Sequence, residues 1–123
     1  MRRWKRNLRL ESNNNTRLRG MLGFAMRAGR VIIGTELVCT AMSKQKNAPK
    51  IVLISATASD GTKKKILNKC AFYGVNARQL DMSGDELGHL LGKLSAPAVV
   101  AVTDEKFAEE IERALDSEAT SEK

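Results

Sequence analysis

The sequence predicts an α/β protein, a three-layer α/β/α sandwich with helices on both faces of one sheet. Segments with apolar residues at three- and four-residue spacing alternate with short apolar runs rich in β-branched residues. Glycine or proline separates several of these segments. The resulting order, α-β-α-β-α-β-α-β-α, is typical of this architecture. The general rule for such connections favours a parallel sheet with right-handed crossovers, while the short helices leave an antiparallel strand open.

The first part of the chain is expected to contain two helices around a short strand. Residues 14–28 form a helix that ends at Gly29, and Arg30–Ile33 is a buried strand. Thr35 caps the second helix, which runs to about Gln45. The apolar residues expected in the core of these helices are Leu18, Leu22, Ala25, Met26, Leu37, Val38, Ala41 and Met42.

A central strand and a third helix follow Pro49. Lys50–Ala56 is a continuous β-branched run, which suits a strand covered on both faces. Ser59, Asp60 and Gly61 then turn the chain into a helix that ends near Gly74. Its core side is expected to consist of Ile66, Leu67 and Cys70.

The last part of the chain is expected to supply two more strands and two more helices. Ala77–Leu80 is a weaker strand, and a short helix begins at Ser83 or Gly84 and runs through Leu91. Ala98–Thr103 is another central strand. Asp104 caps a final amphipathic helix, which carries Phe107, Ile111 and Leu115 on one side.

One domain is expected between two tails. The chain has 123 residues, enough for a single core, and residues 14–116 form the predicted domain. Residues 1–13 are a basic, flexible tail that either frays or follows phosphates, with Trp4 able to stack on a base. Residues 117–123 are expected to be a disordered acidic end.

The charge of the chain favours a polyanionic partner. The net charge is +7, and the sequence pI is about 9.7. Residues 1–30 carry nine Lys or Arg and one Glu, whereas residues 104–123 carry three Lys or Arg and eight Asp or Glu. This asymmetry predicts a polarised surface with one side facing nucleic acid.

Catalytic, metal and membrane chemistry find little support in the sequence. His89 is the single histidine, and G-x-S-x-G, Walker and G-x-G-x-x-G motifs are absent. Cys39 and Cys70 are isolated, and they are expected to be buried thiols in a reducing cytoplasm. The apolar runs are too short to span a bilayer, and no signal peptide is evident. No cofactor, metal or membrane partner is therefore expected for this cytoplasmic, non-catalytic protein.

The segment Met21–Glu36 contains the most informative local feature. It predicts that Gly34, Thr35 and Glu36 lie where a strand ends and a helix begins. The first N–H groups of a helix have no partner within it, so this tip is suited to an anion such as phosphate. The Lys63–Lys65 run at the start of the third helix allows two interpretations, a polyanion nearby or a solvated basic face.

Several separated motifs together resemble one known family. They are the Ala-x-x-Ala-Gly-Arg pattern within Arg19–Glu36, the strand Ile51–Ala58 before the lysine run, Leu-Gly-x-x-x-Gly at Leu87–Gly92, and Ala98–Thr103. In this order they are similar to the ribosomal protein superfamily of the L7Ae and L30e type, particularly its small bacterial YlxQ-type members. The resemblance covers about residues 14–115. It implies an α/β/α sandwich with a mixed four-stranded sheet, and an activity of binding kink-turn RNA.

The resemblance also assigns candidate RNA-binding residues. A kink-turn is a bent helix with tandem sheared G·A pairs beside a bulge, and the start of the second helix enters its groove in this family. Gly34 and Thr35 match that start, while Glu36, Leu37 and Thr40 stand where the family often has Asn, an acidic residue and Lys. The loop that covers the bulge corresponds to Lys93–Ala96. The full candidate set is Arg30, Gly34, Thr35, Glu36, Thr40, Lys63, Lys64, Lys93, Leu94, Ser95 and Ala96.

Three functions remain open at this point. The first is a non-catalytic protein that binds structured RNA, either a kink-turn or ribosomal RNA. Ribosomal proteins are further possible partners of such a protein. The second is a ribosome-associated interaction or assembly module with the same fold that has lost kink-turn recognition. The third and weakest is a substrate-recognition domain that serves an RNA-modifying enzyme in trans.

Overall fold

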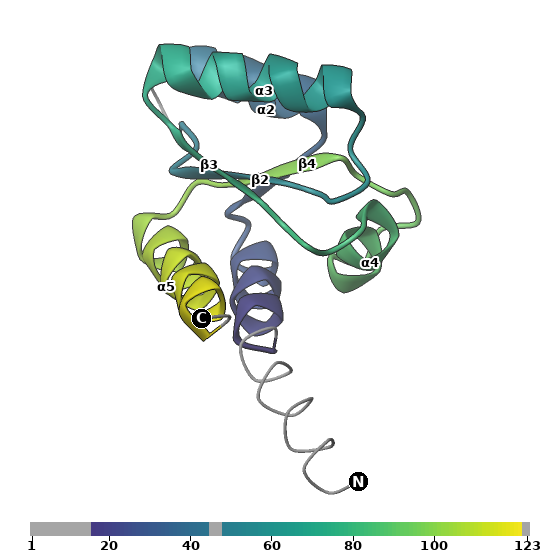
Figure 1. The fold of residues 1–123 in the computed structure, drawn as a ribbon, viewed down its shortest axis with the longest axis vertical. Coiled ribbons are helices and arrows are strands. Elements are labelled where there is room, and N and C mark those ends of the chain that lie inside the picture. The colour runs from purple at the N-terminus through teal and green to yellow at the C-terminus, as the bar shows by residue number, and fades with distance from the viewer. Residues whose placement is uncertain (1–15, 45–47, 122–123) are drawn as a thin grey trace, which may run out of the picture.

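The structure is a computed structural model that describes residues 16–44 and 48–121, with the backbone alone for residues 117–121. Within these ranges, five helices and four strands follow one another (Figure 1). They are a first helix (residues 16–27), β1 (Val31–Ile33), α2 (Thr35–Ser43), β2 (Ile51–Ile54), α3 (Asp60–Tyr73), β3 (Asn76–Gln79), α4 (Gly84–Leu90), β4 (Val99–Val102) and α5 (Glu105–Ser121).

The four strands form one mixed sheet in the order β1-β4-β2-β3. β2 and β3 pair in parallel, whereas β4 is antiparallel to both of its neighbours, β1 and β2. The mixed sheet implied by the family resemblance is therefore confirmed, and the all-parallel rule fails at β4. β4 lies between β1 and β2 and is antiparallel to both, so the two strands that α2 connects are parallel to each other without pairing directly.

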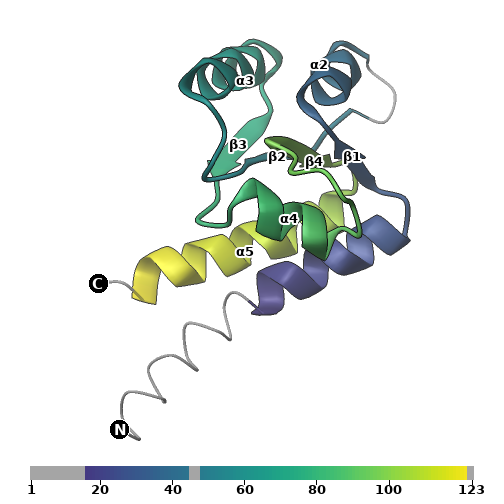
Figure 2. The same cartoon turned by 90° about the vertical axis from the view of Figure 1, so that its right-hand side faces the viewer.

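Helices cover both faces of the sheet (Figures 1 and 2). Alternate side chains of β2 point to opposite faces, as the pleat requires. Val52 and Ile54 pack with α2 and α3, while Ile51 and Leu53 pack with the first helix, α4 and α5. The two clusters make the three-layer sandwich that the element order predicted.

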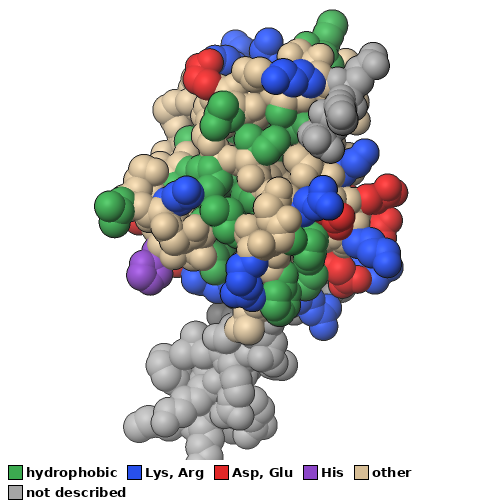
Figure 3. Space-filling view, turned by 180° about the vertical axis from the view of Figure 1, so that it is seen from behind, with side chains coloured by type: hydrophobic (Ala, Val, Ile, Leu, Met, Phe, Trp, Pro, Cys, Tyr) green, Lys and Arg blue, Asp and Glu red, His purple; other side chains and the backbone are tan. Residues whose placement is uncertain are grey.

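The sheet has a partly open edge at β1. Each residue of Val31–Ile33 is half-buried, whereas β2 and β4 are buried along their whole length. Figure 3 views the molecule from the side of β1 and shows hydrophobic side chains between the helices of the two layers.

Three helix starts are capped by polar side chains, and the sequence predicted the cap at Asp104. The Thr62 N–H donates to Ser59 Oγ at 3.2 Å at the start of α3, and the Phe107 N–H donates to Asp104 Oδ2 at 3.0 Å at the start of α5. Ser83 caps α4. Gly74 closes α3 with a φ of 70°, the left-handed conformation that glycine adopts without strain.

The start of α2 differs from the prediction. Gly34, with a φ of 111°, occupies the cap position, and Thr35 is the first helical residue rather than the cap. α2 ends at Ser43, before Gln45. Leu37 is 62% exposed and lies outside the core, because Val38 and Met42 already face the sheet and a neighbouring residue points about 100° away. Leu67 is 39% exposed for the same reason.

The two ends of the chain and the two cysteines were also the subject of sequence predictions. The predicted tail, residues 1–13, lies outside the described residues. α5 continues to Ser121, so residues 117–121 are helical where disorder was expected. Cys70 is buried and Cys39 half-buried. Burial raises the pKa of the Cys70 thiol to about 11, which keeps it protonated and unreactive.

Candidate nucleic-acid interface

Several connections of the fold converge at the end of the sheet where β1 and β2 finish and β4 begins. Because β4 is antiparallel, its start lies beside the ends of β1 and β2. The Gly34 N–H donates to the Val99 carbonyl at 2.9 Å, and the Ser55 N–H donates to the Ala98 carbonyl at 2.8 Å. Figure 2 looks onto this edge, with α4 in front of the strand ends. We call it the loop edge; it consists of Gly34–Thr35, residues 55–59, residues 80–83 and residues 93–98.

Gly34 gives the loop edge its exposed backbone. A φ of 111° is a conformation that residues with a Cβ rarely adopt, so the turn requires glycine. Apart from Gly34 and its two neighbours in the chain, no described residue has an atom within 4 Å of the point where a Gly34 Cβ would stand. The glycine is therefore needed for the backbone conformation and not for internal packing, and it leaves open space on the surface.

The first turn of α2 presents N–H groups beside this glycine. The first i to i−4 hydrogen bond of α2 runs from the Val38 N–H to the Gly34 carbonyl, at 3.0 Å. The N–H groups of Thr35, Glu36 and Leu37 precede that bond. Together with the positive end of the helix dipole, they make this the place where the sequence predicted an anion-binding tip.

A second part of the loop edge is the α4–β4 loop, residues 93–98. A Cβ on Gly88 would overlap the Ser95 carbonyl oxygen, and one on Gly84 would stand 3.0 Å from the Pro97 carbonyl oxygen. The loop thus lies directly on α4, because glycines at these positions make room for it. The Lys93 N–H donates to the Gly88 carbonyl at 2.8 Å.

Within this loop the four candidate residues are all accessible. Lys93, Leu94, Ser95 and Ala96 are exposed, and the Leu94 side chain is fully exposed. The same strand pairing that places Gly34 beside Val99 places this loop next to the tip of α2. The structure therefore brings together the two segments that the resemblance assigned to RNA.

Glu36 lies in the first turn of α2 and pairs with α3. Its Oε2 is 3.3 Å from Lys65 Nζ, and the two side chains are 86% and 47% exposed. An exposed pair of this kind contributes only about 0–1 kcal/mol to folding. Its importance lies in position, because it directs the Glu36 carboxylate toward α3 and partly neutralises Lys65. Thr40 lies one turn further along α2 and is exposed.

The other two lysines of the run lie at the start of α3, next to the loop edge. Lys63 is half-buried and Lys64 is exposed. The backbone N–H of Lys63 donates to the Ser59 carbonyl at 2.9 Å, which ties this turn to the β2–α3 connection. Neighbouring helical residues point about 100° apart, so Lys64 faces a different direction from Lys65.

Arg30 does not join the loop edge. The Thr103 N–H donates to the Arg30 carbonyl at 2.9 Å, which places Arg30 at the opposite end of β1 from Gly34. The separation along the strand is about 13 Å, from four steps of about 3.3 Å each. Both residues belong to the candidate RNA-binding set and are four positions apart in the sequence, but the intervening strand separates them.

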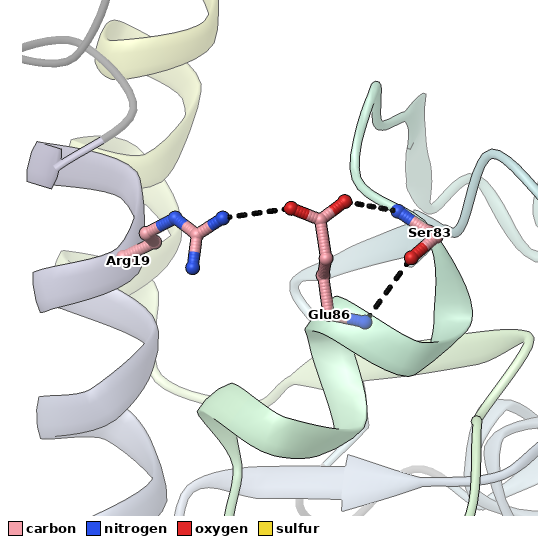
Figure 4. A network of polar contacts seen from close by, with 3 residues as sticks. All are labelled: Arg19, Ser83 and Glu86. Carbon is pink, nitrogen blue, oxygen red and sulfur yellow. Dashed lines mark hydrogen bonds and ion pairs between the residues drawn. The ribbon is translucent and has the colours of Figure 1, made fainter.

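A polar network fixes α4, and with it the α4–β4 loop (Figure 4). The Glu86 N–H donates to Ser83 Oγ at 3.1 Å, and the Ser83 N–H donates back to Glu86 Oε1 at 3.2 Å. Arg19 Nη2 of the first helix lies 3.1 Å from Glu86 Oε2. The hydrogen bond from the Ser83 backbone, followed by the Arg19 charge, lowers the pKa of Glu86. Sequence reasoning did not anticipate this bridge, which joins residues far apart in the chain.

The described part of the chain shows neither a metal-binding cluster nor a membrane-spanning helix. In the described part of the chain, no cluster of three or more His, Cys, Asp or Glu residues is arranged to hold a metal ion. Over those same ranges, no helix combines the length and the apolar character needed to cross a membrane.

Known proteins resemble this chain over most of its length. The sequence profile of the ribosomal protein L7Ae/L30e/S12e/Gadd45 family matches residues 16–112. An RNA-binding protein YlxQ from Bacillus subtilis (strain 168) is 38% identical over 96 residues, 78% of this chain and 92% of the relative. An RNA-binding protein YlxQ from Enterococcus faecium is 31% identical over 107 residues, 87% of this chain and 99% of the relative.

Solved structures show the same fold. A protein of unknown function from Bacillus halodurans superposes with a TM-score of 0.73 at 30% identity, covering 81% of this chain and 97% of its own. A 15.5kD RNA binding protein of Giardia lamblia superposes with a TM-score of 0.68 at 13% identity, covering 88% and 89%. The latter likeness concerns the fold alone. From the profile match and the two relatives, the chain belongs to the ribosomal protein L7Ae/L30e/S12e/Gadd45 family.

Proposed function

We propose that this protein binds structured RNA without catalysis, and that the loop edge recognises a kink-turn. One observation carries the proposal: the Gly34 N–H bonds to the Val99 carbonyl at 2.9 Å, which sets the tip of α2 beside the α4–β4 loop. Both segments are the ones that the family resemblance assigns to RNA. Two relatives that carry the name RNA-binding protein add support.

The tip of α2 supplies close backbone contact in this proposal. A glycine in open space lets a phosphate or a base edge approach the main chain, which a side chain at this point would prevent. The free N–H groups of the first turn donate to phosphate oxygens. Lys63 and Lys64, at the start of α3, add charge next to the same edge.

The α4–β4 loop supplies an apolar contact. Leu94 is fully exposed on a loop that α4 holds in place through Gly88. An unpaired nucleotide in a bulge has an accessible base that such a side chain can cover. Lys93, in the same loop, then lies within reach of the adjoining phosphates.

Glu36 sets the base preference of the tip. An ionised carboxylate only accepts hydrogen bonds, so it cannot contact guanine O6 or N7, which are acceptors. It can accept from the N1–H or N2–H₂ groups of guanine. The ion pair with Lys65 orients the carboxylate, at 3.3 Å from the ammonium group.

A titration with two RNAs tests the proposal. One is a standard kink-turn, and the other is the same RNA with its tandem G·A pairs replaced by Watson–Crick pairs. We expect clearly tighter binding to the kink-turn. Equal affinity for both RNAs would contradict kink-turn recognition and leave general binding to structured RNA.

A second candidate function follows from Leu37. It is 62% exposed in the first turn of α2, where the family often has an acidic residue. An exposed leucine beside the proposed RNA site suits a protein contact better than a phosphate contact. The alternative function is that of an interaction module in ribosome assembly. This alternative predicts that neither RNA binds the protein above background, whereas ribosomal proteins bind it.

A further inference from the structure

The outward side of α3 has an unusual composition for a surface. Five residues at i, i+3, i+4, i+7 and i+8 spacing share one side of the helix, and this spacing normally marks a core-facing stripe. In α3 the core side is instead occupied by Ile66 and Cys70, both buried. The five outward residues are all exposed. We call them the α3 stripe; they are Lys65, Asn68, Lys69, Phe72 and Tyr73.

Two aromatic rings lie together at the end of this stripe. Phe72 is 81% exposed and Tyr73 38% exposed. Their ring centroids are 4.9 Å apart with an interplanar angle of 87°, an edge-to-face arrangement. The same five residues line an open hollow of about 450 Å³. A phenylalanine side chain so exposed contributes little to the free energy of folding. Its position in this hollow therefore suggests a role in binding a ligand.

The charge beside the rings is positive. α3 carries Lys63, Lys64, Lys65 and Lys69 against a single acidic residue, Asp60. Glu36 reaches the stripe from α2 and pairs with Lys65 at its near end. Lys69, between this pair and the rings, is exposed.

Aromatic rings and lysines on one helix side provide both contacts that single-stranded nucleic acid needs. Bases stack on exposed rings without sequence preference, and lysines contact the phosphates between them. An uncharged apolar peptide would use the rings but not the lysines.

We propose that the α3 stripe binds unpaired RNA nucleotides, with a base stacked on Phe72 and phosphates near Lys65 and Lys69. The stripe begins at Lys65, which the Glu36 pair links to the first turn of α2, and Phe72 lies about 10 Å further along the helix. A single strand that leaves the loop edge therefore runs along α3. This path rests on the proposed function, whereas the stacking site itself does not.

The test uses the full chain and four fluorescently labelled RNAs. They are a blunt-ended kink-turn, two versions of it that carry ten unpaired uridines on one strand end or on the other, and a free decauridine. The variants are Phe72→Ala and Phe72→Trp. Phe24→Ala is the matched control, because Phe24 is 52% exposed in the first helix, on the opposite layer, where Arg27 lies 5.0 Å from its ring.

We expect Phe72→Ala to weaken binding of decauridine and of one tailed RNA by roughly 5- to 150-fold, the range expected for one stacked base. Phe72→Trp should retain or increase affinity, since indole also stacks. Phe24→Ala should change nothing, and the blunt kink-turn should bind all variants alike. Tyr73 is the single tyrosine, so in a Trp4→Phe background its fluorescence should be quenched by decauridine.

Several results would overturn the inference. They are equal binding of decauridine by the parent and Phe72→Ala, an equal loss with Phe24→Ala, or self-association of the chain that Phe72→Ala abolishes. If the blunt kink-turn does not bind while decauridine binds in a Phe72-dependent way, the proposed function fails and the stacking site stands.

Discussion

The Ser95 carbonyl oxygen occupies the space that a side chain on Gly88 would fill, so the α4–β4 loop lies directly on α4. The overlap involves backbone and not a flexible side chain, and it can be relieved only by moving the loop or the helix. The α4–β4 loop of the proposed RNA surface thus depends on a buried glycine that lies against it.

Gly88→Ala should therefore destabilise the fold and displace the loop. Overpacking of a tight contact costs about 1–3 kcal/mol, which urea unfolding can measure. Gly20→Ala is the matched control, since its Cβ would meet nothing within 4 Å among the described residues and alanine favours a helix by about 1 kcal/mol. A Gly88→Ala variant as stable as the parent would show that the loop rearranges freely.

Gly34→Ala should reduce both stability and RNA affinity. Alanine at a φ of 111° is strained by roughly 1–3 kcal/mol, although the described residues leave space for its Cβ. Gly74→Ala introduces strain at a φ of 70° away from the loop edge, so it should lower stability with RNA affinity unchanged. If both variants lose affinity equally, the loss reports unfolding and not contact with RNA.

Thr40→Lys should strengthen kink-turn binding. Thr40 is exposed one turn beyond Glu36, and a new phosphate contact there contributes about 1–2 kcal/mol, roughly a five- to thirtyfold gain. Ser43→Lys adds the same charge further from the tip and should gain less. A titration that shows equal gains would indicate a general charge effect, and no gain would place the RNA elsewhere.

Stability should fall in acid, partly through Glu86. Its pKa is lowered in the folded protein below the ordinary value of 4.5, so its stabilising effect is present above pH 4.5 and is lost as the pH falls through the folded value. The difference in unfolding free energy between the parent and Glu86→Gln should therefore shrink between pH 6 and pH 3. Asp85→Asn, which removes a neighbouring carboxylate, controls for charge. A constant difference across this range would contradict the assignment.

Deletion of residues 1–13 should weaken RNA binding without changing its selectivity. The segment carries five Arg or Lys, whose phosphate contacts hold no sequence information. For the full chain, six phosphate contacts predict a log–log salt slope of roughly −4 to −5, and the deletion should flatten it. A loss confined to the kink-turn, with duplex RNA bound as before, would assign selectivity to the tail.

The sequence predicted local structure well wherever a local signal existed. Asp104 caps the last helix as predicted, α3 begins at the turn expected at Ser59, and the β-branched run at Ile51–Ile54 is a central strand. Thr35 failed as a cap because Gly34 already provides the turn through its unusual φ. A cap motif specifies that a helix begins nearby, but the backbone conformation decides at which residue.

Long-range relationships were beyond sequence reasoning. Periodicity cannot show that β4 lies between β1 and β2 and is antiparallel to both. The alternation of side chains along a strand is the same whatever its neighbours or its direction. The pairs Glu36–Lys65 and Arg19–Glu86 join residues 29 and 67 positions apart. Phe72 looked unremarkable in sequence, since its exposure follows from Ile66 and Cys70 already covering the sheet.

The placement of the last strand also sets the order in which the molecule can assemble. β1 pairs only with β4 in the described sheet, and Val31 meets Val102 across about seventy residues of chain. During synthesis from the N-terminus, β1 and the tip of α2 must therefore wait for nearly the whole domain to be translated. β2 pairs with β3 across the short α3 connection, so this unit can form first. The surface proposed to hold RNA is then completed last, and a chain truncated before residue 99 would have no such surface.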